Sequence, residues 1–286
     1  MVRFLQIFVL GCLVILLVGC DAAEKEKPVW EQVKIGDLAP SHSGKGPSDQ
    51  SLKAINFNIY VFELPAENIT ALDDVWQMLY RHPLRFNDYT AFVANSFSVG
   101  FGEIKMWNRI GGLLDAAGAK RAPSVSLFLS DGRADDLAVA RIYREQTISY
   151  ASVGGSMVGA TVGPGRLVLR IRAKKIPGAR GVCYVEVHPV FSPPMRSFIP
   201  ELATRAKAGE LVFGSAGFGL KMSPGDFFLL GPGEYISDQV SLSSLFFSKP
   251  EGSLFYPKLE GRSTLGKPER KPAIRIFMVL CTSINV

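Results

Sequence analysis

The spacing of apolar residues predicts a β-strand at residues 55–64. Apolar and polar side chains alternate there with a period of two, and the apolar ones include Ile55, Phe57, Ile59 and Val61. Such alternation is expected of a strand that buries one face and exposes the other. Pro65 follows closely and ends the predicted strand.

Two amphipathic helices are predicted after this strand. The first spans residues 69–79, where apolar residues recur at helical spacing, and Thr70 and Asp73 are placed like a capping pair at its start. The second spans residues 104–117, and Gly118 supplies its end.

Further strands are predicted on both sides of the second helix. Residues 89–101 form one strand, or two with a bend near Asn95. Residues 125–129 form another, which the turn signal Asp131-Gly132 closes. The order strand, helix, strand, helix, strand favours a small α+β unit, built as an α/β sandwich.

Short strands and turns dominate the rest of the chain. Glycine and proline separate short apolar or alternating runs at 138–143, 146–150, 166–173, 181–190, 210–222, 226–230 and 275–281. Arg166–Arg172 alternates most clearly, with arginines on one face and leucine or isoleucine on the other. This pattern indicates a sheet with one face in solvent. One helix, at 198–208, is predicted among these strands.

The first twenty residues contain an apolar run that no later segment matches. Arg3 gives a positive charge before the run Phe4–Val18, and Gly19 and Cys20 follow it. The run is shorter than the ~20 residues that a membrane-spanning helix needs. A charged start, a short apolar stretch and a small residue before the cleavage point are the parts of a secretory signal. Together with Cys20, they resemble the lipobox of bacterial lipoproteins.

This resemblance implies that Cys20 becomes the first residue of the mature protein, with diacylglycerol on its thiol and a fatty acid such as palmitate. The lipid bilayer is then a partner through Cys20. The folded part lies outside the cytoplasm, in the periplasm or at the cell envelope, anchored to the cell membrane or the outer membrane. A plain cleaved signal, or a buried thiol after a transmembrane anchor, remains open. No other cofactor is expected.

The predicted fold class is α+β, with the small α/β sandwich unit followed by a β-rich domain. The predicted divisions are a signal peptide at 1–19, a lipid anchor and flexible tether at 20–50, the α+β unit at 51–132 and the β-rich domain at 133–286. The composition is typical of a folded protein, because 47% of the residues are hydrophobic and 20% are charged.

The remaining cysteines offer two alternatives. Cys12 leaves with the signal peptide and Cys20 is acylated, so Cys183 and Cys281 remain. Both lie in predicted strands, and they can form a disulfide if those strands are neighbours in an oxidising envelope. Two buried free thiols are the other alternative.

Catalytic and metal-binding patterns are sparse. The chain has no Gly-x-Ser-x-Gly elbow, and the spacing of His42, His82 and His188 is not that of a metal site. We therefore expect neither an enzyme nor a metal site. If the protein were an uncharacterised envelope enzyme, its best candidates would be the acidic residues near the glycine turns, Asp226, Glu234 and Asp238.

The order of elements in the second half also resembles a known family. A helix, a strand, an Asp-Gly turn and a strand come at Leu113–Gly118, Ser124–Leu129, Asp131-Gly132 and Ala138–Tyr143, and Gly165–Ile171 begins with glycine and alternates. A strand, a turn and an apolar strand follow at 218–231, and Arg275–Ile284 closes the chain. This order resembles the core domain of secretins, the ring-forming outer-membrane proteins of secretion and pilus systems. The family's long alternating hairpins are not evident, so the resemblance implies a role in assembly more than in pore formation.

The sequence thus predicts a lipid-anchored, non-enzymatic envelope protein. It would act by protein–protein contacts in envelope assembly or a secretion or pilus-type system. Its partners are other envelope proteins, and homo-oligomerisation is open, with an exposed strand edge at Asp226–Leu230 pairing between subunits. Nucleic acid is not expected as a partner outside the cytoplasm. The alternative is a ligand-binding envelope lipoprotein with an aromatic pocket lined by Phe227, Phe228, Phe246, Phe247, Phe255 and Tyr256.

Overall fold

A computed structural model describes residues 54–194, 209–234, 240–249 and 272–285. The contacts divide the chain into Met1–Asp49 and Gln50–Val286, and the described residues all belong to the second unit. The predicted signal peptide, Cys20, the tether and the helix at 198–208 lie outside the described residues.

One antiparallel sheet, sheet A, joins the two ends of the second unit. Strand β1 (Ala54–Pro65) pairs along its length with β14 (Ala273–Ile284). The order of sheet A is β3 (Phe97–Glu103), β13 (Asp226–Pro232), β14 and β1, and both β4 (Lys120–Arg121) and β5 (Val125–Ser130) pair with the other edge of β1.

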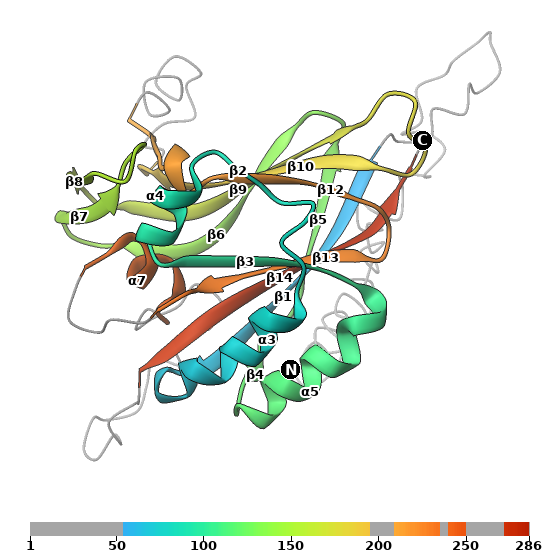
Figure 1. The fold of residues 1–286 in the computed structure, drawn as a ribbon. Helices are drawn as coiled ribbons and strands as arrows, with labels where there is room; N and C mark the ends of the chain where they lie inside the picture. Colours follow the sequence, from blue (N-terminus) through green and yellow to red (C-terminus); the bar gives the residue numbers. More distant parts are fainter. Residues whose placement is uncertain (1–53, 195–208, 235–239, 250–271, 286) are drawn as a thin grey trace, which may run out of the picture. The chain divides into compact units, whose positions relative to one another are not determined.

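A second antiparallel sheet, sheet B, faces the first (Figure 1). Its order is β2 (Arg85–Phe86), β12 (Phe218–Met222), β10 (Cys183–Ser192), β9 (Gly165–Lys175) and β6 (Ala134–Ile142), and β11 (Leu211–Val212) also pairs with β10. Strands β7 (Gln146–Ala151) and β8 (Met157–Val162) form a separate two-stranded ribbon.

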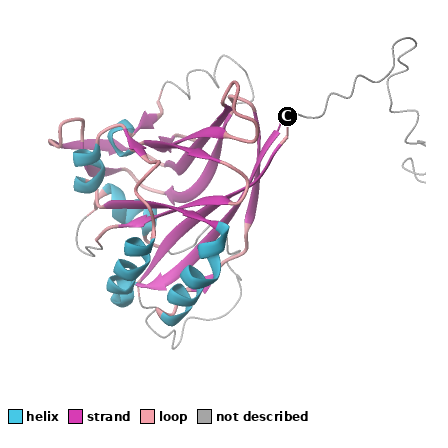
Figure 2. Cartoon of the chain, turned by 45° about the vertical axis from the view of Figure 1, so that its right-hand side comes forward, coloured by secondary structure: helices cyan, strands magenta, loops and turns pink. Residues whose placement is uncertain are grey.

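Two helices, Leu72–Met78 and Trp107–Ala116, cover the outer face of sheet A, as Figures 1 and 2 show. The described helices are η2 (Ala66–Ala71), α3 (Leu72–Met78), α4 (Tyr89–Ala94), η3 (Ile104–Met106), α5 (Trp107–Ala116), η4 (Gly214–Ala216) and α7 (Leu242–Phe247). Alternate side chains of sheet A enter two separate cores. Phe57 and Val279 pack between the sheets, whereas Phe62 and Ile276 pack with α3 and α5.

The predicted α+β fold, rich in β-structure, is confirmed. The division at residues 132 and 133 does not separate two structural units, because strands from both sides of it share each sheet. Strand β1 pairs with β14 in sheet A, and β2 pairs with β12 in sheet B. The α+β unit and the β-rich domain are therefore one compact unit.

Most predicted elements are present, and three local predictions are wrong. The strand predicted at 210–222 is two strands, β11 and β12, with the short helix η4 between them. Residues 89–94 form helix α4 rather than a strand, because the side chain of Asp88 caps it by accepting a hydrogen bond from the backbone N–H of Ala91 at 2.9 Å. The predicted capping pair Thr70 and Asp73 does not cap α3, whose N-cap Ala71 has no side-chain cap hydrogen bond.

Candidate interaction surface

The predicted acidic candidates do not form one site among the described residues. Asp226 and Glu234 lie at opposite ends of β13, and Asp238 lies outside the described residues. The Asp226 carboxylate accepts a hydrogen bond from the Ser223 N–H at 2.7 Å and closes the turn before β13, while burial raises its pKa. No group of three or more His, Cys, Asp or Glu side chains within the described ranges could hold a metal ion.

The aromatic side chains predicted to line a pocket fill the two cores instead. Phe227 packs in the core under the helices, and Phe228, Phe246 and Phe247 pack between the sheets, all with at most 1% exposure. Phe255 and Tyr256 lie outside the described residues.

The predicted exposed edge at Asp226–Leu230 is wrong. Strand β13 lies inside sheet A, between β3 and β14, and its backbone is paired on both sides. A strand flanked in this way offers no unpaired peptide groups to another subunit. An interaction through a strand edge must therefore use a different strand.

The ribbon of β7 and β8 is the most distinctive surface of the described chain. The segment Gln146–Gly165, which contains both strands, has no Asp, Glu, Lys or Arg. Its tip and outer strand expose two large apolar side chains, because Val153 is 78% exposed and Met157 is 62% exposed. Figure 1 shows the ribbon beside α4, at one end of the two sheets.

Buried polar contacts hold the β7 side of the ribbon to the rest of the fold. The Asn95 amide, 3% exposed, donates to the Ala151 carbonyl at 2.9 Å and accepts from the Ala151 N–H at 2.8 Å. The Ser215 hydroxyl also donates to the Ala151 carbonyl, at 2.7 Å. At the tip, the carboxylate of Asp88 accepts from the Gly154 N–H at 2.7 Å. These bonds fix the position of the ribbon without involving β8.

The outer edge of β8 has no strand partner among the described residues. The N–H of Ser152 donates to the carbonyl of Ser156, and hydrogen-bonded pairs alternate from there along the ribbon. The N–H groups of Met157, Gly159 and Thr161 therefore point away from β7. The opposite side of the ribbon fits this assignment, because Ser149, which pairs with Gly159, donates outward to Val240.

The edge strand of sheet B carries features that block pairing. Strand β6, the edge of sheet B, contains Asp135 and Asp136 and a register shift between Ala138 and Ala140. Charges and bulges of this kind protect edges against unwanted pairing. Strand β8 has neither. Strand β5, an edge of sheet A, also has no charged residue, but β8 belongs to a ribbon without any charge from Gln146 to Gly165, so its open edge is the candidate interaction site. The periodicity of the sequence missed β8, and the run of uncharged residues was the signal that could have revealed it.

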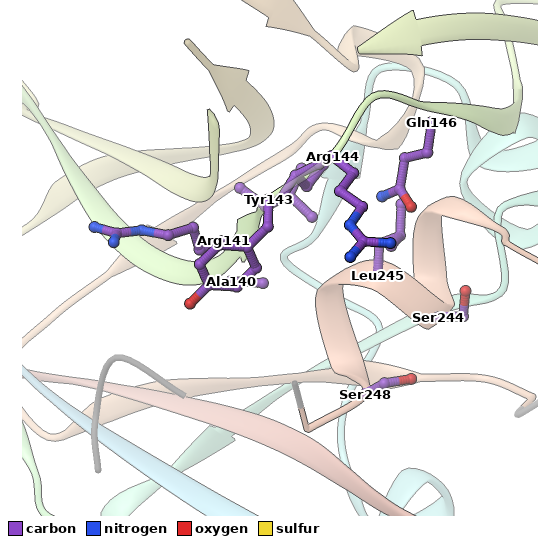
Figure 3. A pocket seen from close by; sticks show the side chains of 10 residues that line it. Ala140, Arg141, Tyr143, Arg144, Gln146, Ser244, Leu245 and Ser248 are labelled. Carbon is purple, nitrogen blue, oxygen red and sulfur yellow. The ribbon is translucent and has the colours of Figure 1, made fainter. Parts of the chain in front are cut away.

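A pocket of about 340 Å³ lies between α7 and the connection from β6 to β7 (Figure 3). Its lining residues are Ala140, Arg141, Ile142, Tyr143, Arg144, Gln146, Leu167, Ser244, Leu245 and Ser248. In Figure 3, Arg144 and Gln146 point toward α7, whereas Arg141 points away from Arg144. The two guanidinium groups do not converge, so the pocket lacks the focused polar groups of a ligand site.

Charged side chains form a network on the outer face of sheet B. Arg170 makes ion pairs with Asp136 at 2.7 Å and Glu210 at 2.8 Å, and these two carboxylates raise its pKa. His188 is the neighbour of Arg170 on β10. Its Nδ1 is buried and has no hydrogen-bond partner, and Gly217 covers the ring so closely that a Cβ there would lie 2.4 Å from Nδ1.

We expect His188 to reduce the free energy of unfolding as the pH falls from about 7 through its ordinary pKa of about 6.5. Burial lowers its pKa in the folded state, an effect that Glu186 opposes and Arg170 reinforces. The unfolded chain therefore binds an extra proton once the pH falls below the ordinary histidine pKa, and the loss of stability stops below the folded-state pKa. Urea unfolding of the wild type and of His188→Gln across this range should show a shallower pH dependence in the variant.

The difference in free energy of unfolding between the wild type and His188→Gln at each pH contains no contribution from Asp226, because both proteins have this residue. Its raised pKa acts in the opposite direction, because a folded state that binds more protons gains stability as the pH falls. Equal slopes for the wild type and His188→Gln would show that His188 does not titrate differently on unfolding.

Cys183 and Cys281, for which the sequence left a disulfide and two free thiols open, are buried free thiols on facing sheets. Cys183 begins β10 in sheet B, and Cys281 lies in β14 in sheet A. Both side chains are 0% exposed and belong to the core between the sheets.

Comparisons with known proteins leave the chain without an assigned family. No protein-family model matches it, and no curated protein matches its sequence. It is similar to a solved structure, the secretin domain β-barrel of InvG from the Salmonella SPI-1 injectisome, with 10% identity and a TM-score of 0.24. The similarity covers 82% of this chain and 64% of that one. A TM-score this low supports no conclusion about the family or function of the chain.

No helix within the described ranges has the length and apolar character needed to cross a membrane.

Proposed function

We propose that this protein is a lipid-anchored envelope protein that acts through protein–protein contacts in assembly, and that β8 is the strand through which copies of the chain pair. The observation that carries the proposal is the open, uncharged edge of β8, on a ribbon that buried hydrogen bonds hold in place. Pairing of two β8 strands would give an isologous contact, in which each copy offers the same residues to the other.

The composition of the ribbon supports pairing with a second copy. Two identical charged edges would repel each other, whereas Gln146–Gly165 carries no charge. Small residues at Gly159 and Ala160 allow two backbones to approach closely. Because the ribbon is already held by Asn95 and Asp88, pairing needs little additional ordering of the chain.

Sedimentation velocity of the detergent-extracted protein tests this function. We expect the mean mass to rise with protein concentration. Association should strengthen with added salt, because the full sequence has a net charge of +6 and loses only Arg3 with the signal peptide, so two mature copies repel each other. A mass that stays at one copy at all concentrations and salt levels would contradict self-pairing.

The lipid anchor has a separate test at Cys20. If this thiol carries diacylglycerol, the variant Cys20→Ser should fail to be cleaved or should leave the membrane fraction after cleavage, because serine forms no thioether. Fractionation followed by mass measurement of the N-terminal peptide distinguishes these products. Normal processing and normal membrane retention of the variant would exclude lipidation at this residue, without affecting the proposal for β8.

A further inference from the structure

Cys183 and Cys281 meet at the corner where one sheet passes into the other. Cys183 pairs in register with Met222, the last residue of β12 in sheet B. The chain then turns through Ser223–Gly225 into sheet A, where the N–H of Gly225 donates to the carbonyl of Cys281 at 2.8 Å. Only this short turn separates the partner of one cysteine from the partner of the other.

The two side chains also lie in the same core. Each strand directs its cysteine into the core between the sheets, where both are 0% exposed. The interaction between the two thiols lowers the pKa of Cys183 and raises the pKa of Cys281, as expected of neighbouring groups. Neighbouring thiols on facing strands can form a disulfide where their Cα atoms come within about 7 Å of each other.

We propose that Cys183 and Cys281 are a cross-linking site, and that a disulfide between them joins the two sheets when the chain folds in an oxidising compartment. The oxidant is a disulfide, either a thiol–disulfide oxidoreductase in its oxidised form or oxidised glutathione. This proposal does not depend on pairing through β8.

The exchange proceeds in two steps that conserve atoms and electrons. The thiolate of one cysteine attacks the oxidant disulfide, forms a mixed disulfide and releases one thiolate of the oxidant. The thiolate of the other cysteine then attacks the mixed disulfide, forms the Cys183–Cys281 bond and releases the second thiolate. The two released thiolates take up the two protons that the cysteines lost, so the oxidant is reduced to two thiols. Because both side chains are buried in the folded protein, the exchange occurs before the core closes.

Refolding of the full mature protein tests the site directly. The denatured, reduced chain is refolded in a buffer of reduced and oxidised glutathione, then unfolded in denaturant that contains N-ethylmaleimide so that any buried free thiol is blocked, and digested without reduction. We expect peptide mapping to find the Cys183 and Cys281 peptides joined, with neither thiol blocked. Two blocked thiols, stable mixed disulfides with glutathione, or a bond between two copies of the chain would overturn the proposal.

The melting temperature gives a second measurement. A disulfide between residues 183 and 281 closes a loop of about 100 residues, which should raise the melting temperature by roughly 10 °C. Dithiothreitol should remove this increase in the wild type and should leave Cys281→Ala unchanged. In that variant Cys183 should be recovered with its thiol blocked. Peptide mapping of the wild type decides the proposal even if Cys281→Ala fails to fold.

Discussion

Replacing Thr161 with lysine should weaken self-association of the protein by roughly tenfold or more. Thr161 lies on β8, its side chain is exposed, and its backbone N–H points to the open edge. In a contact between two β8 strands, each copy would bring one new positive charge to the same small interface. The change leaves the fold intact, since the threonine makes one exposed hydrogen bond, to Thr147 at 3.2 Å.

The matched control is Phe128→Lys. Phe128 is 69% exposed on β5, which is another edge strand, so this variant adds the same charge to a different edge. Sedimentation at several protein concentrations should show loss of association for Thr161→Lys and normal association for Phe128→Lys. The opposite result would place the contact at β5, and an effect of both variants would indicate repulsion by net charge rather than blocking of a specific edge.

Local patterns in the sequence predicted the elements whose burial follows a simple period. The alternation of Ile55, Phe57 and Ile59 is found in β1, where all three are 0% exposed. The prediction of a strand at Tyr89–Ala94 is wrong, because the tyrosine, threonine, phenylalanine and valine in this segment favour strands when considered alone. Asp88 outweighs these preferences by capping the helix, and Ala91 and Phe92 are its buried residues.

The candidate interaction surface depends on information that local patterns do not contain. Residues 157–162 are Met, Val, Gly, Ala, Thr and Val, and glycine and alanine weaken a strand signal. That β8 is an open edge, whereas β13 is a central strand, follows only from the pairing of strands distant in sequence. Strand β13 has its partners about 50 residues away in β14 and about 130 residues away in β3. The predicted exposed edge therefore fell on the wrong strand.

The same long-range pairing explains why two domains were predicted where one unit exists. The local order of helices and strands is complete by residue 132, but β1 has an edge that only β14 fills, from the other end of the chain. The core between the sheets likewise draws side chains from both halves, such as Phe57 and Leu169. Neither half can close its core without the other, so residues 50–286 should unfold in one cooperative transition.

The variant Phe228→Ala tests whether the two halves share one core. It should lower the free energy of unfolding more than any other substitution named above. Phe228 extends from β13 in sheet A, is 1% exposed, and meets Phe218 of β12 in sheet B edge to face, with ring centroids 5.4 Å apart. Removing the ring leaves a cavity between sheets that cannot collapse easily, so the free energy of unfolding should fall by about 3–5 kcal/mol. Phe128→Ala removes the same ring from a 69% exposed position and should change the free energy of unfolding by less than about 0.5 kcal/mol.

Urea unfolding followed by circular dichroism and by tryptophan fluorescence measures both variants. In Phe228→Ala the two signals should shift together, because Trp107 lies in the helix-covered core on the other side of β13. Separate transitions in that variant would show that the helices and sheet A form a unit that is stable without the contact to sheet B.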